Sequence, residues 1–180
     1  MTGYTLLHLP ASTLLITLCV LTACSRSAPD LSRFTEEEPP PESSELQVAD
    51  PLAARQLLSG WYPVEQNSWR WTAKNFAVIL RRPVGAAKAG ARLTLEFTLP
   101  DVVLSRLRSV TLRASIEGAP VAPETYRAVG KQTYARDVPA SLLSRHTLRV
   151  DFALDKALPP NPADRRELGL IVDRVGLDTK

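Results

Sequence analysis

Residues that could carry redox or metal chemistry are scarce in this sequence. Its 180 residues include two cysteines, Cys19 and Cys24, and two histidines, His8 and His146. Because both cysteines lie within the first 24 residues, the rest of the chain cannot form a disulfide of its own, a zinc–thiolate site or a cysteine nucleophile. Glycine-rich phosphate loops, Gly-x-Ser-x-Gly elbows and His-Glu-x-x-His runs are also absent from the sequence. We therefore predict a protein that is not an enzyme and that holds no metal and no cofactor.

Carboxylates and one histidine are the remaining candidates for catalysis. Asp151 and Asp155 flank the end of a predicted strand, and Glu65 lies near aromatic residues. A glycosidase-like carboxylate pair is therefore an alternative interpretation. Acidic residues at strand ends are usually solvated, however, and His146 at the start of the same strand has the pattern of a surface residue.

An apolar run of ten residues without charge, Leu14 to Ala23, lies near the N-terminus. It is too short for a membrane-spanning helix and has the length of a secretory signal. It ends in Leu21-Thr22-Ala23-Cys24, which resembles the lipobox of bacterial lipoproteins. The resemblance implies a signal peptide over residues 1–23, cleavage before Cys24, and attachment of lipid to that cysteine. Because no lysine or arginine precedes the run, an ordinary cleaved signal and an uncleaved anchor remain alternatives.

Lipid attachment at Cys24 determines the expected location. Several acyl chains, each contributing about 0.8 kcal/mol per buried CH₂, anchor a protein stably where one chain is marginal. By the same resemblance, Ser25 in place of aspartate after the cysteine favours the outer membrane. We expect a protein of the bacterial cell envelope, anchored in the outer membrane and facing the periplasm, with the lipid bilayer as one partner.

Charge and proline content divide the remaining chain into a tether and a domain. Residues 24–49 are acidic, proline-rich and poor in apolar side chains, which predicts an extended, disordered tether. Residues 50–180 are predicted to form one domain, which from Pro51 onward carries 20 Lys and Arg against 12 Asp and Glu, a net charge of +8. A basic domain attracts anionic envelope components. We expect no nucleic-acid partner, because the basic residues are dispersed along many strands.

Alternating apolar residues predict an all-β fold. Three segments place Leu, Val, Ile, Ala or Phe at every second position: 91–99, 109–117 and 147–154. Residues 76–82 are apolar on both faces, which predicts a central strand, and residues 83–90 are expected to form a loop. Glu96 of the 91–99 segment is expected to point outward. Residues 167–177 predict the last strand, with Val172 on one face and Val175 on the other. Short strands at roughly ten-residue spacing, without a long helix, indicate an antiparallel β-sandwich. One short N-terminal helix is expected over residues 51–58, after an Asp50 N-cap.

All three tryptophans lie within eleven residues of each other. A strand over Trp69–Trp71 would place both of its indoles on one face and Arg70 on the other. Trp69 and Trp71 could stack on sugar rings, while Arg70, Glu65 and Asn67 supply planar hydrogen-bonding groups. Because Trp61 is expected in a loop and therefore more exposed than Trp71, the candidate ligand-binding set is Trp61, Glu65, Trp69 and Arg70.

The alternative interpretation of the same region is structural. Trp71 would pack in the core, and Arg70 would form an ion pair with Asp164 or Glu167 that joins the first strand to the last.

Two motifs resemble a known group of modules. They are Gly60-Trp61-Tyr62 followed by Trp69-Arg70-Trp71-Thr72, and Asp164-Arg165-Arg166-Glu167-Leu168-Gly169-Leu170. They are similar to the jelly-roll, galactose-binding-like modules attached to bacterial glycosyltransferases and surface-polysaccharide proteins. The resemblance implies a sandwich fold over residues 60–177 and suggests glycan binding without naming the glycan. It assigns the structural motif to Trp71, Asp164, Arg166 and Gly169.

Two functions are compatible with these features. The first is a membrane-anchored envelope lipoprotein whose non-catalytic domain binds an envelope glycan. The second is a scaffold lipoprotein that docks a protein partner of an envelope assembly or export system through an exposed edge strand.

Replacing Cys24 tests the anchor. The Cys24→Ala variant should leave the membrane fraction and lose labelling by a fatty-acid analogue, because the thiol that takes the lipid is gone. Cys19→Ala, which removes the other cysteine, is the control and should change neither. Mass spectrometry that finds an unmodified peptide spanning Ala23 and Cys24 in the wild-type protein would contradict the lipoprotein assignment.

Overall fold

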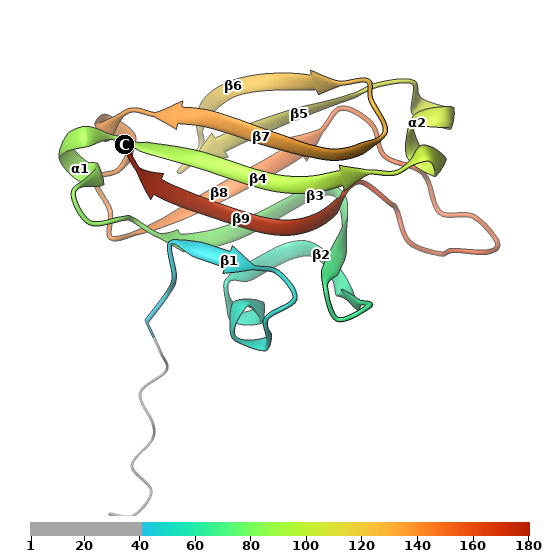
Figure 1. Ribbon diagram of the computed structural model, residues 1–180, viewed down its shortest axis with the longest axis horizontal. Coiled ribbons are helices and arrows are strands. Elements are labelled where there is room, and N and C mark those ends of the chain that lie inside the picture. The colour runs from blue at the N-terminus through green and yellow to red at the C-terminus, as the bar shows by residue number, and fades with distance from the viewer. Residues whose placement is uncertain (1–40) are drawn as a thin grey trace, which may run out of the picture. The chain divides into compact units, whose positions relative to one another are not determined.

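Nine antiparallel strands make up most of the computed structural model, which describes residues 41–180 (Figure 1). The strands are β1 (Glu45–Gln47), β2 (Leu57–Glu65), β3 (Trp69–Arg81), β4 (Ala91–Leu99), β5 (Val110–Ile116), β6 (Ala119–Tyr126), β7 (Gly130–Val138), β8 (Thr147–Leu154) and β9 (Ile171–Thr179). The helices are η2 (Pro51–Arg55), α1 (Ala86–Ala89), α2 (Asp101–Leu107) and η3 (Ala140–Leu142). No helix within residues 41–180 is long and apolar enough to cross a membrane. The predicted signal peptide, Cys24 and most of the tether lie outside the described residues.

The strands form a nearly closed sheet in the order β6-β5-β8-β3-β9-β4-β7, with β1 added to β9 and β2 added to β3. The sheet folds into two layers at β3 and β9, which share only two register pairs, Arg70–Val172 and Trp71–Ile171. Figure 1 shows β7, β4 and β9 side by side in one of the layers. The two ends of the sheet meet where Tyr134 Oη and Arg136 Nε of β7 both donate to the Ala122 carbonyl of β6. The predicted all-β, antiparallel β-sandwich is confirmed.

The core lies between the two layers and follows the predicted alternation. The inward residues of β4 are at most 1% exposed, and those of β5 and β8 are also buried: Leu93, Leu95, Phe97, Leu99, Val110, Leu112, Ala114, Ile116, Leu148, Val150, Phe152 and Leu154. Phe76 of β3 stacks on Phe152 of β8 with ring centroids 4.9 Å apart. Across the layers, Phe97 packs edge-to-face on Tyr126 at 5.0 Å. Aromatic and branched side chains therefore fill the sandwich without disulfides.

The N-terminal helix is shorter than the sequence predicts. Asp50 caps it as expected, with its side chain accepting from the Leu52 amide, but η2 ends at Arg55 and the chain then enters β2. The buried Gln56 causes this change of direction, because its amide group bonds to both backbone groups of Ser43 and to the Ile79 carbonyl. The expected helix over 51–58 is therefore wrong beyond Arg55.

The folded unit begins earlier than residue 50. Glu45–Gln47 forms β1 against β9, within the segment that the sequence assigns to the tether. Leu46 is 4% exposed and Val48 is fully buried. Two apolar side chains at alternate positions are enough to add a short strand to an available edge, although the surrounding composition is that of a linker.

Two further boundaries differ from the prediction. Residues 86–89 form the helical turn α1 inside the segment expected as a loop. The last strand starts at Ile171 rather than Glu167, and before it Leu168 forms only an isolated bridge with Leu158.

The approach to β9 is locked against β3 by three hydrogen bonds. The Gly169 amide donates to the Thr72 carbonyl at 2.7 Å, and the Leu170 amide donates to Thr72 Oγ1 at 3.1 Å. The Thr72 amide donates in return to the Leu170 carbonyl. A Cβ at Gly169 would lie 2.8 Å from the Ala73 carbonyl oxygen, Thr72 Oγ1 and a Leu154 methyl carbon, so only glycine fits without a shift.

Substituting Gly169 tests this close approach. Gly169→Ala should lower the free energy of unfolding by about 1–3 kcal/mol, the usual cost of overpacking, as measured by urea denaturation. Gly176→Ala is the matched control, because a Cβ there would meet only the Glu45 residue, at 3.4 Å or more. Equal effects of the two substitutions would contradict the proposed steric role of Gly169.

Candidate functional site

Trp61, one of the predicted ligand-binding residues, lies in β2 rather than in a loop and is partly buried. Its Nε1 donates to the Ala77 carbonyl at 2.9 Å, and its ring packs edge-to-face on Phe76 with centroids 5.1 Å apart. The indole therefore fastens β2 onto β3, and its polar atom is already engaged.

Strand β3 begins with Trp69, Arg70 and Trp71. As predicted, the two tryptophans lie on one face of the strand and Arg70 lies on the other. Trp71 is 8% exposed and belongs to the core, and the partly buried Trp69 packs edge-to-face on it at 6.3 Å. Arg70 donates from Nε to the Val48 carbonyl at 2.7 Å and from Nη1 to the Tyr62 carbonyl at 3.0 Å. Arg70 therefore holds the segment after β1 and strand β2 against β3.

The two sequence motifs meet at Arg166, about one hundred residues after the first motif. Arg166 Nη1 bonds to Glu65 Oε1 at 2.6 Å, Nε and Nη2 bond to the Asp164 carboxylate, and the guanidinium lies 5.3 Å from the Tyr62 ring centroid. Hydrogen bonds from Arg166 lower the pKa of Asp164, and the two carboxylates raise the pKa of Arg166. The structure thus brings Glu65, Asp164 and Arg166 into one network.

The ion pair expected between Arg70 and Asp164 or Glu167 is therefore wrong. Arg70 takes backbone carbonyls as its partners, and Asp164 pairs with Arg166. Glu167 accepts from the Lys74 amide at 2.9 Å. The joining role that the sequence assigned to Arg70 belongs to Arg166, whose position two residues after Asp164 favours a local bidentate pair.

A β-bulge at Asp173 creates a polar pocket on the outer face of β4, β7 and β9. Glu96 pairs with Arg174 and Phe97 with Val172, so Asp173 is an extra residue in β9. Bulges redirect side chains and are frequent beside functional sites. The pocket has a volume of about 250 Å³, and its walls include Gln47, Ser68, Glu96, Lys131, Gln132 and Asp173.

Asp173 is a partly buried charged group of this pocket that lacks a direct partner among residues 41–180. Its carboxylate makes no hydrogen bond or ion pair with any residue in the described part of the chain. Burial, and secondarily the charge of Glu96, raise the pKa of Asp173, while Lys131 opposes this shift. The pocket therefore holds a partly desolvated carboxylate that can accept hydrogen bonds from a ligand.

Two arginines organise the pocket without lining it. Arg174 Nη1 bonds to Glu45 at 2.7 Å, and its Nε lies 3.3 Å from Glu96 without hydrogen-bond geometry. Arg70 fixes Val48, the neighbour of Gln47. Ser68, which also lines the pocket, is the last residue of the β2–β3 turn, where Gln66 and Asn67 have left-handed backbones.

The other candidate catalytic carboxylates, Asp151 and Asp155, each bond to a different group. Asp155 accepts from the Thr111 amide at 2.7 Å, and Asp151 is bound by Arg149. Within residues 41–180, no three His, Cys, Asp or Glu side chains are arranged to hold a metal ion.

Asp173 and Glu96 were missed as site residues in the sequence, although Glu96 was expected to point outward. The available signal is spacing: Val172 and Val175 are both buried although they are three residues apart. In a regular strand they would face opposite sides, so two buried residues at that spacing indicate a bulge between them. The sequence interpretation instead placed Val172 and Val175 on opposite faces, which is wrong.

Replacing Arg166 tests whether its network joins the two motifs. Arg166→Gln should lower the free energy of unfolding by about 1–2 kcal/mol, because Glu65 and Asp164 lose charged hydrogen bonds that are only partly screened by solvent. Arg165→Gln, the neighbouring exposed arginine, should change it by less than about 0.5 kcal/mol. Urea denaturation compares them, and equal midpoints would contradict the joining role.

A scan of the sequence against protein-family models gave no match, and a search of curated proteins gave none. Among solved structures, the chain is similar to a family 35 carbohydrate-binding module from Clostridium thermocellum, with 15% identity and a TM-score of 0.46 over 75% of this chain and 98% of that one. It is also similar to an acetyl xylan esterase (Est2A) from the rumen bacterium Butyrivibrio proteoclasticus, with 12% identity and a TM-score of 0.44 over 76% of this chain and 33% of the esterase. A third structure, containing CBM51-2 in complex with GlcNAc and INT domains from Clostridium perfringens ZmpB, has 14% identity and a TM-score of 0.36 over 77% of this chain and 28% of that one. The chain thus spans about a third of the length of the esterase, and similarities at this level indicate neither a ligand nor an activity for it.

Proposed function

We propose that this protein is a lipid-anchored, non-catalytic glycan-binding protein of the bacterial cell envelope, and that glycan binds in the Asp173 pocket. The observation that supports the proposal is the bulge in β9, which opens a polar pocket around a carboxylate that has no hydrogen-bond or ion-pair partner among residues 41–180. A pocket that combines acceptors with amide and ammonium donors is suited to holding a polar ligand.

The lining of the pocket matches the hydrogen-bonding pattern of a sugar. Ring hydroxyls both donate and accept, so they need carboxylates as acceptors and amides or ammonium groups as donors. Asp173 and Glu96 supply acceptors, Lys131 supplies donors, and the side-chain amides of Gln47 and Gln132 supply both. The mixture favours a hydroxyl-rich ligand over a purely anionic or apolar one.

The four sequence-predicted ligand residues divide between two roles in this proposal. Trp61, Glu65 and Arg70 use their polar atoms to hold β2 and the end of β1 in place, so they position the pocket. Trp69 follows Ser68 of the pocket wall and is partly exposed, so it is the remaining candidate for direct contact with a sugar ring.

The envelope part of the proposal depends on Cys24. A lipid on that thiol would keep the domain at the outer membrane, on its periplasmic side, with residues 24–40 between the anchor and the described fold. Glycans of the envelope would then be the polymers within its reach.

The scaffold alternative, docking through an edge strand, has less support. The β6 edge contains Pro120 and Pro123, which lack an amide hydrogen, and Arg136 of β7 already donates to the carbonyls of Ala122 and Pro123. The added strand β1 is only three residues long. Blocked and short edges disfavour strand addition.

Asp173→Asn tests the glycan proposal. With the full chain on an array of neutral hexose and N-acetylhexosamine oligosaccharides, the variant should bind its best glycan about tenfold more weakly, because a charged acceptor is lost. Asp178→Asn, an exposed aspartate of the same strand, is the control and should leave binding unchanged. Absence of binding to every glycan by the wild-type protein would overturn the proposal.

The pH dependence of that binding has a definite sign. Because the pKa of Asp173 is raised, the carboxylate is protonated at a higher pH than an ordinary aspartate, and affinity should fall as pH drops through that pKa. Folding depends on the same group with the opposite sign: ionisation of a carboxyl with a raised folded pKa reduces stability as pH rises. Asp173→Asn should therefore bind weakly while being at least as stable as wild type at neutral pH. A destabilised variant would indicate a structural role instead.

A further inference from the structure

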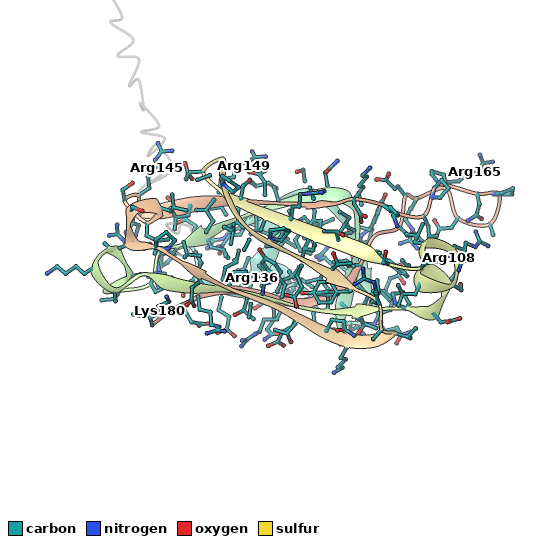
Figure 2. The ribbon with its side chains drawn as sticks, turned by 90° about the horizontal axis from the view of Figure 1, so that it is seen from above. Arg108, Arg136, Arg145, Arg149, Arg165 and Lys180 are labelled. Atoms are coloured by element: carbon teal, nitrogen blue, oxygen red, sulfur yellow. The ribbon has the colours of Figure 1, made fainter. Side chains whose placement is uncertain are left out.

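A second and larger pocket lies on the other layer of the sandwich, at the outer face of β3 and β8. Its volume is about 580 Å³, and its walls include Ile79, Glu117, Arg145, His146, Thr147 and Arg149. Figure 2 shows Arg145 and Arg149 toward the same end of the molecule, with Arg165 at the opposite end. The volume lies within the range of small-molecule sites.

Glu117 supplies an ionised acceptor in this pocket. It occupies the β5–β6 turn with a left-handed backbone (φ 49°), followed by Gly118. Its carboxylate accepts from the Arg149 amide at 2.7 Å and from Arg145 Nη1 at 2.9 Å. These hydrogen bonds lower the pKa of Glu117, so the group is charged at neutral pH.

The cationic groups around Glu117 keep free donors. The Arg145 side chain is 71% exposed and bonds to Glu117 through Nη1 alone. Arg149 uses Nε and Nη2 for Asp151, which leaves its Nη1. His146 is exposed and makes no side-chain bond with residues 41–180, and Arg81 flanks the pocket opposite Thr147. Donors and one fixed anionic acceptor therefore face the same space.

We propose that this pocket binds an acidic sugar unit, one that carries a carboxylate together with free ring hydroxyls. The carboxylate would bond to the free guanidinium donors of Arg145 and Arg149, since planar forks match carboxylates. A ring hydroxyl would donate to Glu117, and the C–H face of the ring would lie against Ile79 on the pocket wall.

The charge of Glu117 decides between this ligand and other anions. A phosphate dianion or an anionic membrane surface offers acceptors only, so it would bring a like charge close to Glu117 without donating a hydrogen bond to it. A sugar acid satisfies both kinds of group at once, because its hydroxyls donate where its carboxylate accepts. The pocket thus selects for a ligand with one negative charge and neighbouring donors.

The inference does not depend on the Asp173 pocket, because the two pockets lie on different layers and share no residue. Glucuronate oligomers could fail to bind here while neutral sugars still bind at Asp173, and the reverse is equally possible. Separate variants therefore test the two proposals separately.

His146 provides a reporter for the experiment. In a full chain carrying His8→Gln, it gives the only imidazole signals in the NMR spectrum. Glucuronate oligomers should shift these signals in a saturable manner, and glucose oligomers of equal length should not. Arg145→Gln should weaken glucuronate binding about tenfold or more, through loss of charged hydrogen bonds, whereas Arg165→Gln, with the same change of net charge, should not.

A second variant separates a sugar acid from other anions. Glu117→Gln should weaken glucuronate binding and strengthen binding of inorganic phosphate, because the repulsive charge is removed; near-ultraviolet circular dichroism checks that the β5–β6 turn keeps its packing. Three outcomes would overturn the proposal: equal shifts with glucose oligomers, equal losses in Arg145→Gln and Arg165→Gln, or shifts produced only by vesicles of anionic phospholipid.

Discussion

The junction between β3 and β9 is the constraint on which the rest of the structure depends. β3 is thirteen residues long and pairs with β2, β8 and β9, yet only two register pairs connect it to β9. The bonds among Thr72, Gly169 and Leu170 continue that junction beyond the strands, and the Arg166 network closes it at the surface. Because the bonds of Thr72 to Gly169 and Leu170, and the bond of Arg166 to Glu65, join residues about one hundred positions apart, the two layers can assemble only when both ends of the domain are present.

The architecture could be predicted because most of its strands are regular. In β4, β5 and β8, period-two apolar patterns coincide with buried positions, and this pattern alone specifies a sandwich with one solvated side per layer. The prediction failed where a tertiary contact overrides local composition. Leu46 and Val48 are held by an edge of β9 and not by their acidic neighbours, and Gln56 turns the chain out of the helix by bonding to Ser43 and Ile79.

The candidate site was less predictable than the fold, for a geometric reason. The sequence identifies aromatic and motif residues. In the structure, however, the polar atoms of Trp61, Arg70 and Arg166 form hydrogen bonds with backbone carbonyls and carboxylates within the domain. The polar pocket instead surrounds Asp173 and Glu96, and their proximity depends on one inserted residue in β9 and on pairing across three strands. Neither can be inferred from residue type at a single position.

The placement of the two pockets on opposite layers has a consequence for how polymers would be held. Neighbouring units of one stiff chain cannot enter both at once, since the whole thickness of the sandwich separates them. Two different strands of a polymer network can, and a domain occupied on both sides would act as a cross-link between them. In a dense matrix, avidity would then hold the domain more tightly than either pocket does alone. This gain in affinity would be lost when the matrix is diluted into single chains.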